Sequence, residues 1–344
     1  MTLPLVHELG VTCADFSADG ARLATGSRDG AVNVWDVKSG KAMFPALKHD
    51  ACVGFLRFVS NGSQLMTFSR DGTATIWDTE TGRLIRQVLK LDWNKNTRVF
   101  SIMRVADLSP NERWFARSVR SPVSGKDGVG VWDLSNEPVE EPVILEHSGG
   151  VQSVRFSRDT RHIVVASFPN GAATVWETST GLQVGGNLEH DHMVNYAEFG
   201  PDGRLVVTAS ADRAARIWDA KTGKPLSGPL KHTDDVITAK FSPDGLRVVT
   251  ASWDMTARVW DVATGMPLMK PFRHDDFLHY AEFSSDGRQV ATACLDGTVQ
   301  LWEIPVVQSP RASMVGRVGG CRVYRSISRS SVPIEATIAR IRFE

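Results

Sequence analysis

The chain has 344 residues, and its 39 Lys and Arg residues balance 39 Asp and Glu residues, so the formal net charge is zero. This balance excludes a general electrostatic attraction to nucleic acid or to an anionic membrane surface. Four scattered cysteines without a CxxC pair argue against a disulfide framework, and we find neither a signal peptide nor an apolar run of about 18 residues. We therefore expect a cytoplasmic protein.

One repeating unit organises the chain up to residue 304. Tryptophans followed by Asp or Glu recur at intervals of 42, 55, 44, 42, 42 and 42 residues, at Trp35, Trp77, Trp132, Trp176, Trp218, Trp260 and Trp302. In chain order, a complete unit carries a His, a strand ending in Phe, a turn such as SPDG, a strand such as RVVTAS, a turn with Asp, and a strand ending in Trp-Asp. A Thr-Gly turn usually leads to a fourth strand. Alternating apolar residues between such turns indicate half-buried antiparallel strands. Because one such sheet cannot bury both faces, we expect seven sheets stacked radially in a ring.

These features resemble a WD-repeat (WD40) β-propeller, an all-β fold of seven four-stranded antiparallel blades, over residues 1–304. The regular units also resemble bacterial WD40 arrays, which are often joined to signalling domains such as protein kinases. In this family a His, a Ser or Thr, an Asp and the Trp of a blade form a hydrogen-bonded structural lock, since buried His, Thr and indole groups need partners. The resemblance implies five complete locks: His7, Thr25, Asp29 and Trp35; His49, Thr67, Asp71 and Trp77; His190, Thr208, Asp212 and Trp218; His232, Thr250, Asp254 and Trp260; and His274, Thr292, Asp296 and Trp302.

The N-terminal segment MTLPLV precedes the first His of the chain as KPLSGPL precedes His232. We infer that this N-terminal segment supplies the outer strand of the last blade. Such a closure would remove two exposed strand edges.

The third unit departs most from the pattern. It keeps Trp132, has Asp127 one place out of register, and has no His at the matching position. We expect it to be the softest blade. It is also 13 residues longer than a regular unit, and its insertions carry Trp93, Lys95, Arg98, Arg120 and Lys126. Insertions in repeat arrays often mark the binding face, although drift in a tolerant loop is the alternative.

The fourth unit predicts an incomplete lock. It keeps His147 and Trp176 but has Val165 where Thr is expected. Asn170, with one extra residue, stands in place of the Asp.

Trp253 suggests a partner-binding face, because a large indole in a turn between two strands is otherwise unexpected. In the resembled family, the residues three and five places after the His, and the one before the turn Asp, commonly contact partners. On one side of this face they comprise Ile237, Trp253, Phe277, His279 and Leu295. An exposed apolar patch containing Trp is typical of an interaction site. The alternative is that the indole covers a neighbouring loop or Arg side chain.

A second hypothesis assigns nucleic-acid or phosphorylated-ligand binding to Arg28, Arg70 and the tail. Residues 305–344 contain seven Arg, no Lys and two acidic residues. We expect this tail to be poorly ordered, with a basic docking arm as the alternative, although its TIARIRF stretch alternates well enough to form an added strand. Binding through these arginines should weaken steeply with salt.

The sequence does not point to an enzyme. The His, Ser or Thr, and Asp of each unit recur around the ring, whereas catalysis needs one cleft with one placed nucleophile. His162, His192 and His279 lack metal-ligand spacing, and no phosphate-binding glycine motif is present. A propeller enzyme would need an unrepeated polar cluster in the central channel, and we identify none. We therefore expect a non-enzymatic scaffold without cofactor or metal that binds a protein or peptide; a place in a larger protein or complex is left open.

Overall fold

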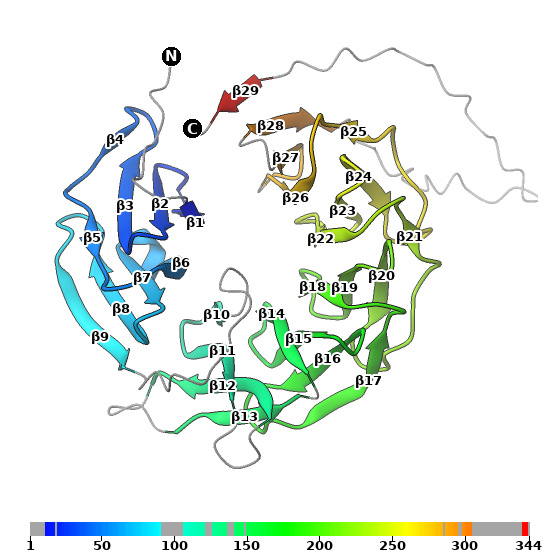
Figure 1. Ribbon diagram of the computed structural model, residues 1–344, viewed down its shortest axis with the longest axis horizontal. Helices are drawn as coiled ribbons and strands as arrows, with labels where there is room; N and C mark the ends of the chain where they lie inside the picture. The colour runs from blue at the N-terminus through cyan, green and yellow to red at the C-terminus, as the bar shows by residue number, and fades with distance from the viewer. Residues whose placement is uncertain are drawn as a thin grey trace, which may run out of the picture.

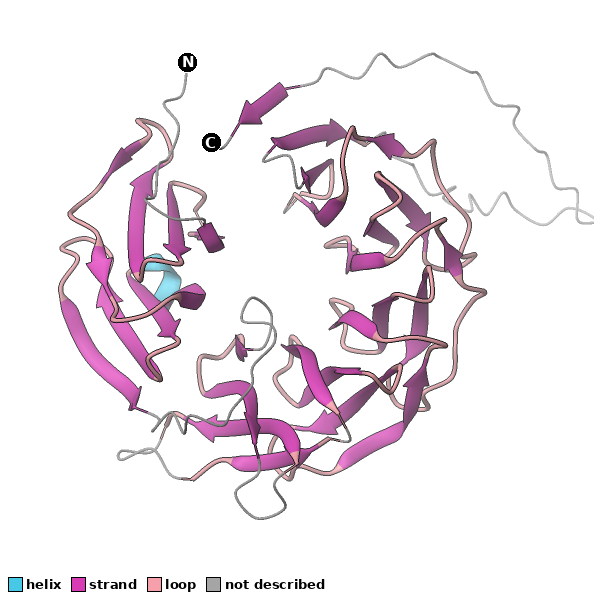
Figure 2. Ribbon diagram, in the orientation of Figure 1, coloured by secondary structure: helices cyan, strands magenta, loops and turns pink. Residues whose placement is uncertain are grey.

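The structure, a computed structural model, describes residues 11–17, 19–90, 106–120, 126–135, 141–147, 149–284, 286–294, 298–304 and 339–342. Seven antiparallel sheets are arranged around a central axis, which confirms the predicted seven-bladed propeller (Figure 1). Figure 2 shows that the described chain consists of strands, turns and loops with a single helical turn, Ser60–Gly62. No helix within the described ranges is both long and apolar enough to cross a lipid bilayer.

The first three blades, numbered along the chain, differ in their outer strands. Blade one contains β1 (Val11–Phe16), β2 (Arg22–Ser27), β3 (Ala31–Asp36), β4 (Lys41–Ala42) and β5 (Leu47–Lys48). Blade two contains β6 (Val53–Val59), β7 (Gln64–Ser69), β8 (Thr73–Asp78) and β9 (Leu84–Lys90). Blade three contains β10 (Ala106–Leu108), β11 (Trp114–Arg120), β12 (Asp127–Asp133) and β13 (Val143–Glu146). Blade one has five strands because two short segments, β4 and β5, both pair with β3.

The other four blades have four strands each. Blade four contains β14 (Gly150–Phe156), β15 (His162–Phe168), β16 (Ala172–Glu177) and β17 (Gln183–Glu189). Blade five contains β18 (Val194–Phe199), β19 (Leu205–Ser210), β20 (Ala214–Asp219) and β21 (Leu230–Lys231). Blade six contains β22 (Val236–Phe241), β23 (Arg247–Ser252), β24 (Thr256–Asp261) and β25 (Phe272–Arg273). Blade seven contains β26 (Leu278–Phe283), β27 (Gln289–Cys294), β28 (Thr298–Glu303) and β29 (Ala339–Arg342).

Side-chain hydrogen bonds fix the turns between the strands. In the turn after β22, the Ser242 hydroxyl accepts a hydrogen bond from Arg247 N at 3.0 Å, and Asp244 accepts one from Leu246 N at 3.0 Å. After β20, Asp219 accepts bonds from the backbone N and the hydroxyl of Thr222 at 2.8 and 2.7 Å. Short Ser, Asp and Thr side chains replace backbone partners in such turns, which explains why SPDG and Asp-x-x-Thr-Gly recur in the sequence.

The hydrophobic core lies between neighbouring blades. Val164, Ala173 and Leu188 of blade four pack in one buried cluster with Phe199 and Trp218 of blade five. Each sheet therefore buries a face against the next sheet, as a radial stack requires. In every blade the first strand lies nearest the centre and later strands lie further out (Figure 1).

The expected closure of the last blade is wrong in one respect. The outer position beside β28 is occupied by β29, with Thr298 opposite Arg342 and Leu301 opposite Ala339. The added strand in TIARIRF, which we considered as an alternative, therefore takes the position that we assigned to residues 1–6. Those N-terminal residues lie outside the described part of the chain.

Candidate interaction site

Blades five and six contain the full set of lock hydrogen bonds. In blade six, His232 Nδ1 lies 2.8 Å from Asp254 Oδ2, His232 Nε2 lies 2.7 Å from the Thr250 hydroxyl, and Trp260 Nε1 donates to that hydroxyl at 2.9 Å. In blade five the corresponding distances, among His190, Asp212, Thr208 and Trp218, are 2.8, 2.6 and 2.8 Å. Burial would raise the pKa of Asp212, but the hydrogen bond from His190 and nearby backbone groups lowers it to about 2. These groups satisfy one another's hydrogen-bonding capacity, so they stabilise the blade.

The locks of blades one, two and seven are described in part. Trp35, Trp77 and Trp302 donate to the hydroxyls of Thr25, Thr67 and Thr292 at 2.8, 2.8 and 2.9 Å. His49 and His274 contact Thr67 and Thr292 through Nε2 at 2.8 and 3.0 Å. Asp71 lies 3.6 Å from His49 Nδ1, and Asp29 accepts a hydrogen bond from Ala31 N at 2.9 Å. His7 and Asp296 lie outside the described residues.

Blade four obtains its lock hydroxyl from a different strand. Val165 lies opposite Thr174 across the β15–β16 pair. The Thr174 hydroxyl lies 2.7 Å from His147 Nε2 and accepts a hydrogen bond from Trp176 Nε1 at 2.9 Å. His147 Nδ1 is buried, and within the part of the chain that the structure describes it has no hydrogen-bond partner. Among the described residues, the blade therefore keeps the lock hydroxyl but has no carboxylate that accepts a hydrogen bond from the histidine. Burial lowers the pKa of His147 to about 4.

Blade three replaces the lock with packing. Arg117, buried on β11, lies opposite Gly130, and its guanidinium stacks 4.7 Å from the centre of the Phe68 ring in blade two. Burial lowers the pKa of Arg117 to about 10. Asp127 begins β12 on the surface, opposite Arg120, and Lys126 is exposed beside it. Trp93, Lys95 and Arg98 of the first insertion lie outside the described residues.

The exposed apolar patch consists of Trp253, Met255 and Phe277. Trp253 lies in the turn between β23 and β24, and Phe277 immediately precedes β26, so two neighbouring blades contribute to the patch. The two ring centroids are 6.0 Å apart with an interplanar angle of 41°. Trp253, Met255 and Phe277 remain 40%, 38% and 39% exposed. The indole therefore packs against an aromatic ring, yet both rings keep much of their surface in solvent.

Met255 was missed by the sequence analysis. Its backbone φ is +61°, in the left-handed region, where the matching turns of blades one, two and four have Gly30, Gly72 and Gly171. Arg213 takes the same conformation in blade five, with φ of +68°. A non-glycine residue there costs about 1 kcal/mol. A signal was present in the sequence, because Met255 stands where a turn of this kind favours glycine.

Ile237 and His279 occupy a different environment from Trp253 and Phe277. Both are half-buried and lie at bulges, where the pairing of β22 with β23 and of β26 with β27 shifts register. At the equivalent bulge of blade five, Asn195 donates to Val236 O of the next blade at 2.9 Å. These positions thus lie at the inner edge between blades. Leu295 lies outside the described residues.

Arg28 and Arg70 are exposed in the corresponding turns of blades one and two. Burial raises the pKa of the nearby Cys52 thiol, and the positive charges of Arg70 and Arg28 oppose part of that rise. The two arginines therefore both lie near Cys52, and we refer to them as the basic pair. It lies in different blades from the apolar patch.

A ring of alternating charge lines the inner strands, and we did not recognise it in the sequence. Each innermost strand has a Phe or Leu at or near its C-terminal end. The residue immediately before it is charged in all seven blades: Asp15, Arg57, Asp107, Arg155, Glu198, Lys240 and Glu282. Neighbours are linked, as Arg57 Nη1 lies 3.1 Å from Asp107 Oδ1 and Lys240 Nζ lies 3.1 Å from Glu282 Oε2. We had identified no unrepeated polar cluster in the channel. These residues hold one position in every blade, but their identities change from blade to blade.

Acidic members of this ring also bind backbone amides of the next blade. Asp15, Asp107 and Glu198 accept hydrogen bonds from the N atoms of Phe58, Phe156 and Phe241 at 2.8, 2.9 and 3.0 Å. Among the described residues there is no group of three or more His, Cys, Asp or Glu side chains arranged to hold a metal ion.

Comparisons with known proteins agree with this architecture. The family model described as "WD domain, G-beta repeat" matches residues 2–36, 46–78, 184–219, 223–261 and 267–303, which together are more than half of the chain. A solved structure, the computationally designed Ika8 protein, superposes with a TM-score of 0.68 at 22% identity, over 86% of this chain and 84% of that one. This likeness concerns the fold alone. A search of curated proteins gives no match.

Proposed function

Since the chain belongs to the WD40 family, whose propellers generally mediate protein interactions, we propose that it is a non-enzymatic scaffold that binds a peptide or protein segment at the Trp253 patch. The observation that carries the proposal is the contact between Trp253 and Phe277 at 6.0 Å, with both rings about two-fifths exposed. Aromatic side chains at the junction of two blades offer a large and rigid apolar surface, and such residues dominate binding energy at protein interfaces.

The charges around the patch support a partner with a basic flank. Asp234 and Asp235 precede β22, where Asp235 O accepts a hydrogen bond from Trp253 N at 2.9 Å, and Asp275 and Asp276 precede Phe277. The two loops next to the patch therefore carry four carboxylates. Burial and the neighbouring Asp234 raise the pKa of Asp235, while His192 and Arg213 oppose part of that rise. We therefore propose a segment with an apolar or aromatic anchor next to Lys or Arg. Charge complementarity of this kind selects the partner and speeds association.

A selection from a random peptide library tests the proposal without knowledge of the natural partner. The wild-type protein is the bait, and the Trp253→Ala, Phe277→Ala double variant removes binders that recognise other surfaces. We expect enriched peptides with an aromatic or aliphatic anchor beside a basic residue. Their affinity, measured by calorimetry, should fall at least about tenfold in the double variant.

Leu246→Ala is a matched control, because Leu246 is 60% exposed in the turn between β22 and β23, at the opposite end of the same blade. This variant should bind the selected peptides like the wild type. If no peptide distinguishes wild type from the double variant, the patch is not the binding site. If binding instead disappears with added salt and requires Arg28 and Arg70, the basic pair is the binding surface.

The cytoplasm remains the compartment that we propose. Cys13 and Cys52 are free thiols, as a reducing compartment favours. Burial raises the pKa of Cys13 to about 12, so this thiol is unreactive.

A further inference from the structure

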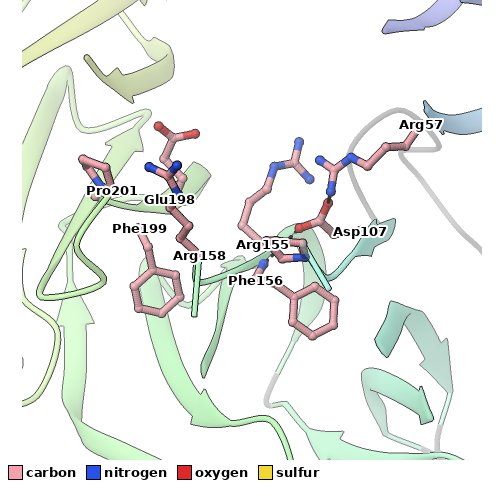
Figure 3. A pocket seen from close by; sticks show the side chains of 10 residues that line it. Arg57, Asp107, Arg155, Phe156, Arg158, Glu198, Phe199 and Pro201 are labelled. Carbon is pink, nitrogen blue, oxygen red and sulfur yellow. Dashed lines mark hydrogen bonds and ion pairs between the residues drawn. The ribbon is translucent and has the colours of Figure 1, made fainter. Parts of the chain in front are cut away.

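A pocket lies on the face opposite the Trp253 patch. The pocket, of about 210 Å³, is lined by the inner strands of blades two to five and by the turns that follow the inner strands of blades three to five. In an antiparallel blade, these turns lie at the other end from the turn that carries Trp253. Figure 3 shows the side chains of Arg155 and Arg158 together with those of Asp107 and Glu198 in the pocket. This site is independent of the proposed peptide-binding face.

The two carboxylates of the pocket are already engaged by the protein. Asp107 Oδ2 accepts a hydrogen bond from Phe156 N at 2.9 Å, and Asp107 Oδ1, which has no hydrogen-bond partner among the described residues, forms an ion pair with Arg57 Nη1 at 3.1 Å. Both oxygens of Glu198 are also used, since they accept hydrogen bonds from Phe241 N at 3.0 Å and from the Tyr196 hydroxyl at 2.8 Å. Three guanidinium groups thus face two carboxylates, which leaves the lining of the pocket with one net positive charge.

Arg155 is positioned by its neighbours but keeps donors for a ligand. Its Nε donates to the Tyr196 hydroxyl at 3.2 Å, and its Nη1 donates to Val154 O at 2.8 Å. For Nη2 the structure shows no acceptor among the residues it describes. The guanidinium also stacks 5.3 Å from the centre of the Tyr196 ring. A guanidinium held in this way loses little freedom when it binds an oxyanion, because its orientation is already fixed.

Arg158 is the exceptional residue of the pocket. It occupies the second position of the turn that follows an inner strand, where the other six units have Ala18, Ser60, Pro110, Pro201, Pro243 and Ser285. Its side chain is exposed and makes no hydrogen bond or ion pair within the described part of the chain. The same turn holds Thr160 in the left-handed region, with φ of +64°. A β-branched residue is strained in that conformation, and strain of this kind is often retained at functional sites.

We propose that this pocket binds a compact oxyanion with two charges, in the form of a phosphate monoester or phosphate, between Arg155 and Arg158. Two arginines can present parallel N–H donors to the oxygens of such an anion, a geometry that favours phosphate. The pocket is smaller than the roughly 300–1,000 Å³ of sites for drug-sized ligands. It therefore fits free phosphate or the phosphate group of a phosphorylated side chain, and both present the same doubly charged oxyanion to the arginines.

The test uses the full chain and calorimetric titration at pH 7.5, with ionic strength held constant by sodium chloride. The two probes are inorganic phosphate and a short, otherwise uncharged phosphoserine peptide. We expect saturable binding of one equivalent to the wild type. Arg158→Ala should weaken binding at least about tenfold, because it removes charge-assisted hydrogen bonds while leaving an exposed turn intact. Tighter binding of the peptide would support a phosphorylated chain segment as the ligand, and tighter binding of phosphate would support a free anion.

Arg161→Ala is the matched control, since Arg161 is exposed three residues further along and does not line the pocket. It removes the same charge from the same loop and should leave the affinity unchanged within about twofold. Equal losses in Arg158→Ala and Arg161→Ala would overturn the proposal, because they would indicate general surface electrostatics. Lack of saturable binding of either probe to the wild type would also overturn it.

Discussion

Thr174 stands directly opposite Val165 in blade four, and its hydroxyl makes the hydrogen bonds to histidine and tryptophan that Thr208 and Thr250 make in blades five and six. The hydroxyl has moved to the neighbouring strand, while the groups that need it, His147 and Trp176, have kept their places. What is preserved between blades is therefore the position of an oxygen atom in space rather than the residue that carries it.

Thr174→Val should destabilise the protein by about 2–3 kcal/mol. The substitution keeps the shape of the side chain but leaves buried groups of His147 and Trp176 without a partner, which costs the desolvation energy of each. Thr75→Val is the matched control, because Thr75 is buried at the equivalent position of blade two, where the lock hydroxyl belongs to Thr67. Urea unfolding of both variants measures the difference.

A double variant tests whether the location of the oxygen is what matters. Val165→Thr combined with Thr174→Val returns the hydroxyl to the strand that carries it in five other blades. It should recover at least about half of the lost stability. Equal stability of the double variant and Thr174→Val alone would show that the hydroxyl is not the cause.

The stability of blade four should depend on pH through His147. Burial lowers its pKa from 6.5 to about 4, so the unfolded chain binds the proton more tightly than the folded protein. The stabilising contribution is complete well above pH 6.5, is lost as the pH falls below 6.5, and stops decreasing below about pH 4. Between pH 7 and pH 5 the loss should be about 2 kcal/mol.

Urea unfolding at these two pH values, for the wild type and His147→Gln, isolates this contribution. The variant should show a pH dependence smaller by about 2 kcal/mol, whatever its stability at pH 7. An unchanged pH dependence would mean that His147 does not carry the effect.

Trp253→Ala should change the free energy of unfolding by less than about 1 kcal/mol, because the side chain is 40% exposed. Trp260→Ala should cost about 3–5 kcal/mol, since this tryptophan is only 4% exposed and its indole bonds Thr250. Thermal unfolding followed by circular dichroism compares the two. A large loss for Trp253→Ala would make the indole a structural residue and undermine its assignment to a partner.

Met255→Gly should raise stability while lowering affinity for the selected peptides. Glycine relieves about 1 kcal/mol of cost in the left-handed backbone conformation, and after allowance for its greater freedom in the unfolded chain a gain of about 0.5 kcal/mol remains. Arg213→Gly, the same change in blade five, should give a similar gain without removing apolar surface. Unfolding and peptide titration of both variants would reveal the opposite trends, and unchanged peptide affinity in Met255→Gly would exclude Met255 from the patch.

The repeat predicted the fold because its signals are local. A tryptophan every 42 residues, with turn residues at fixed offsets, specifies a blade without knowledge of distant contacts. The identity of the last outer strand is not local. Both MTLPLV and TIARIRF had been considered as strands, and only the pairing of β28 with Ala339–Arg342 distinguishes them. The exchange of Val165 for Thr174 was missed for the same reason, because it appears only once the register of two strands is known.

The candidate sites also combine residues that the sequence indicates locally with contacts that depend on how distant segments pack. Trp253 and Phe277 are 24 residues apart in sequence, and the family pattern placed both on one face, but their ring contact depends on how two blades pack. The phosphate pocket gave no continuous motif, because its arginines and acids come from different blades. Arg158 was nevertheless visible in the sequence as the one charged residue at its turn position.

The alternating inner ring has an odd number of members, because each of the seven blades contributes one charged residue. Seven members cannot alternate in sign all the way round, so one junction must bring two like charges together. That junction joins the first and last blades, where burial raises the pKa of Asp15 and the negative charge of Glu282 raises it further. Loss of a single interior blade would create a second mismatch, whereas loss of two adjacent blades would not. Between the two ends of the chain the ring therefore favours gain or loss of blades in pairs, whereas loss of the first or the last blade would leave six members that alternate without a mismatch.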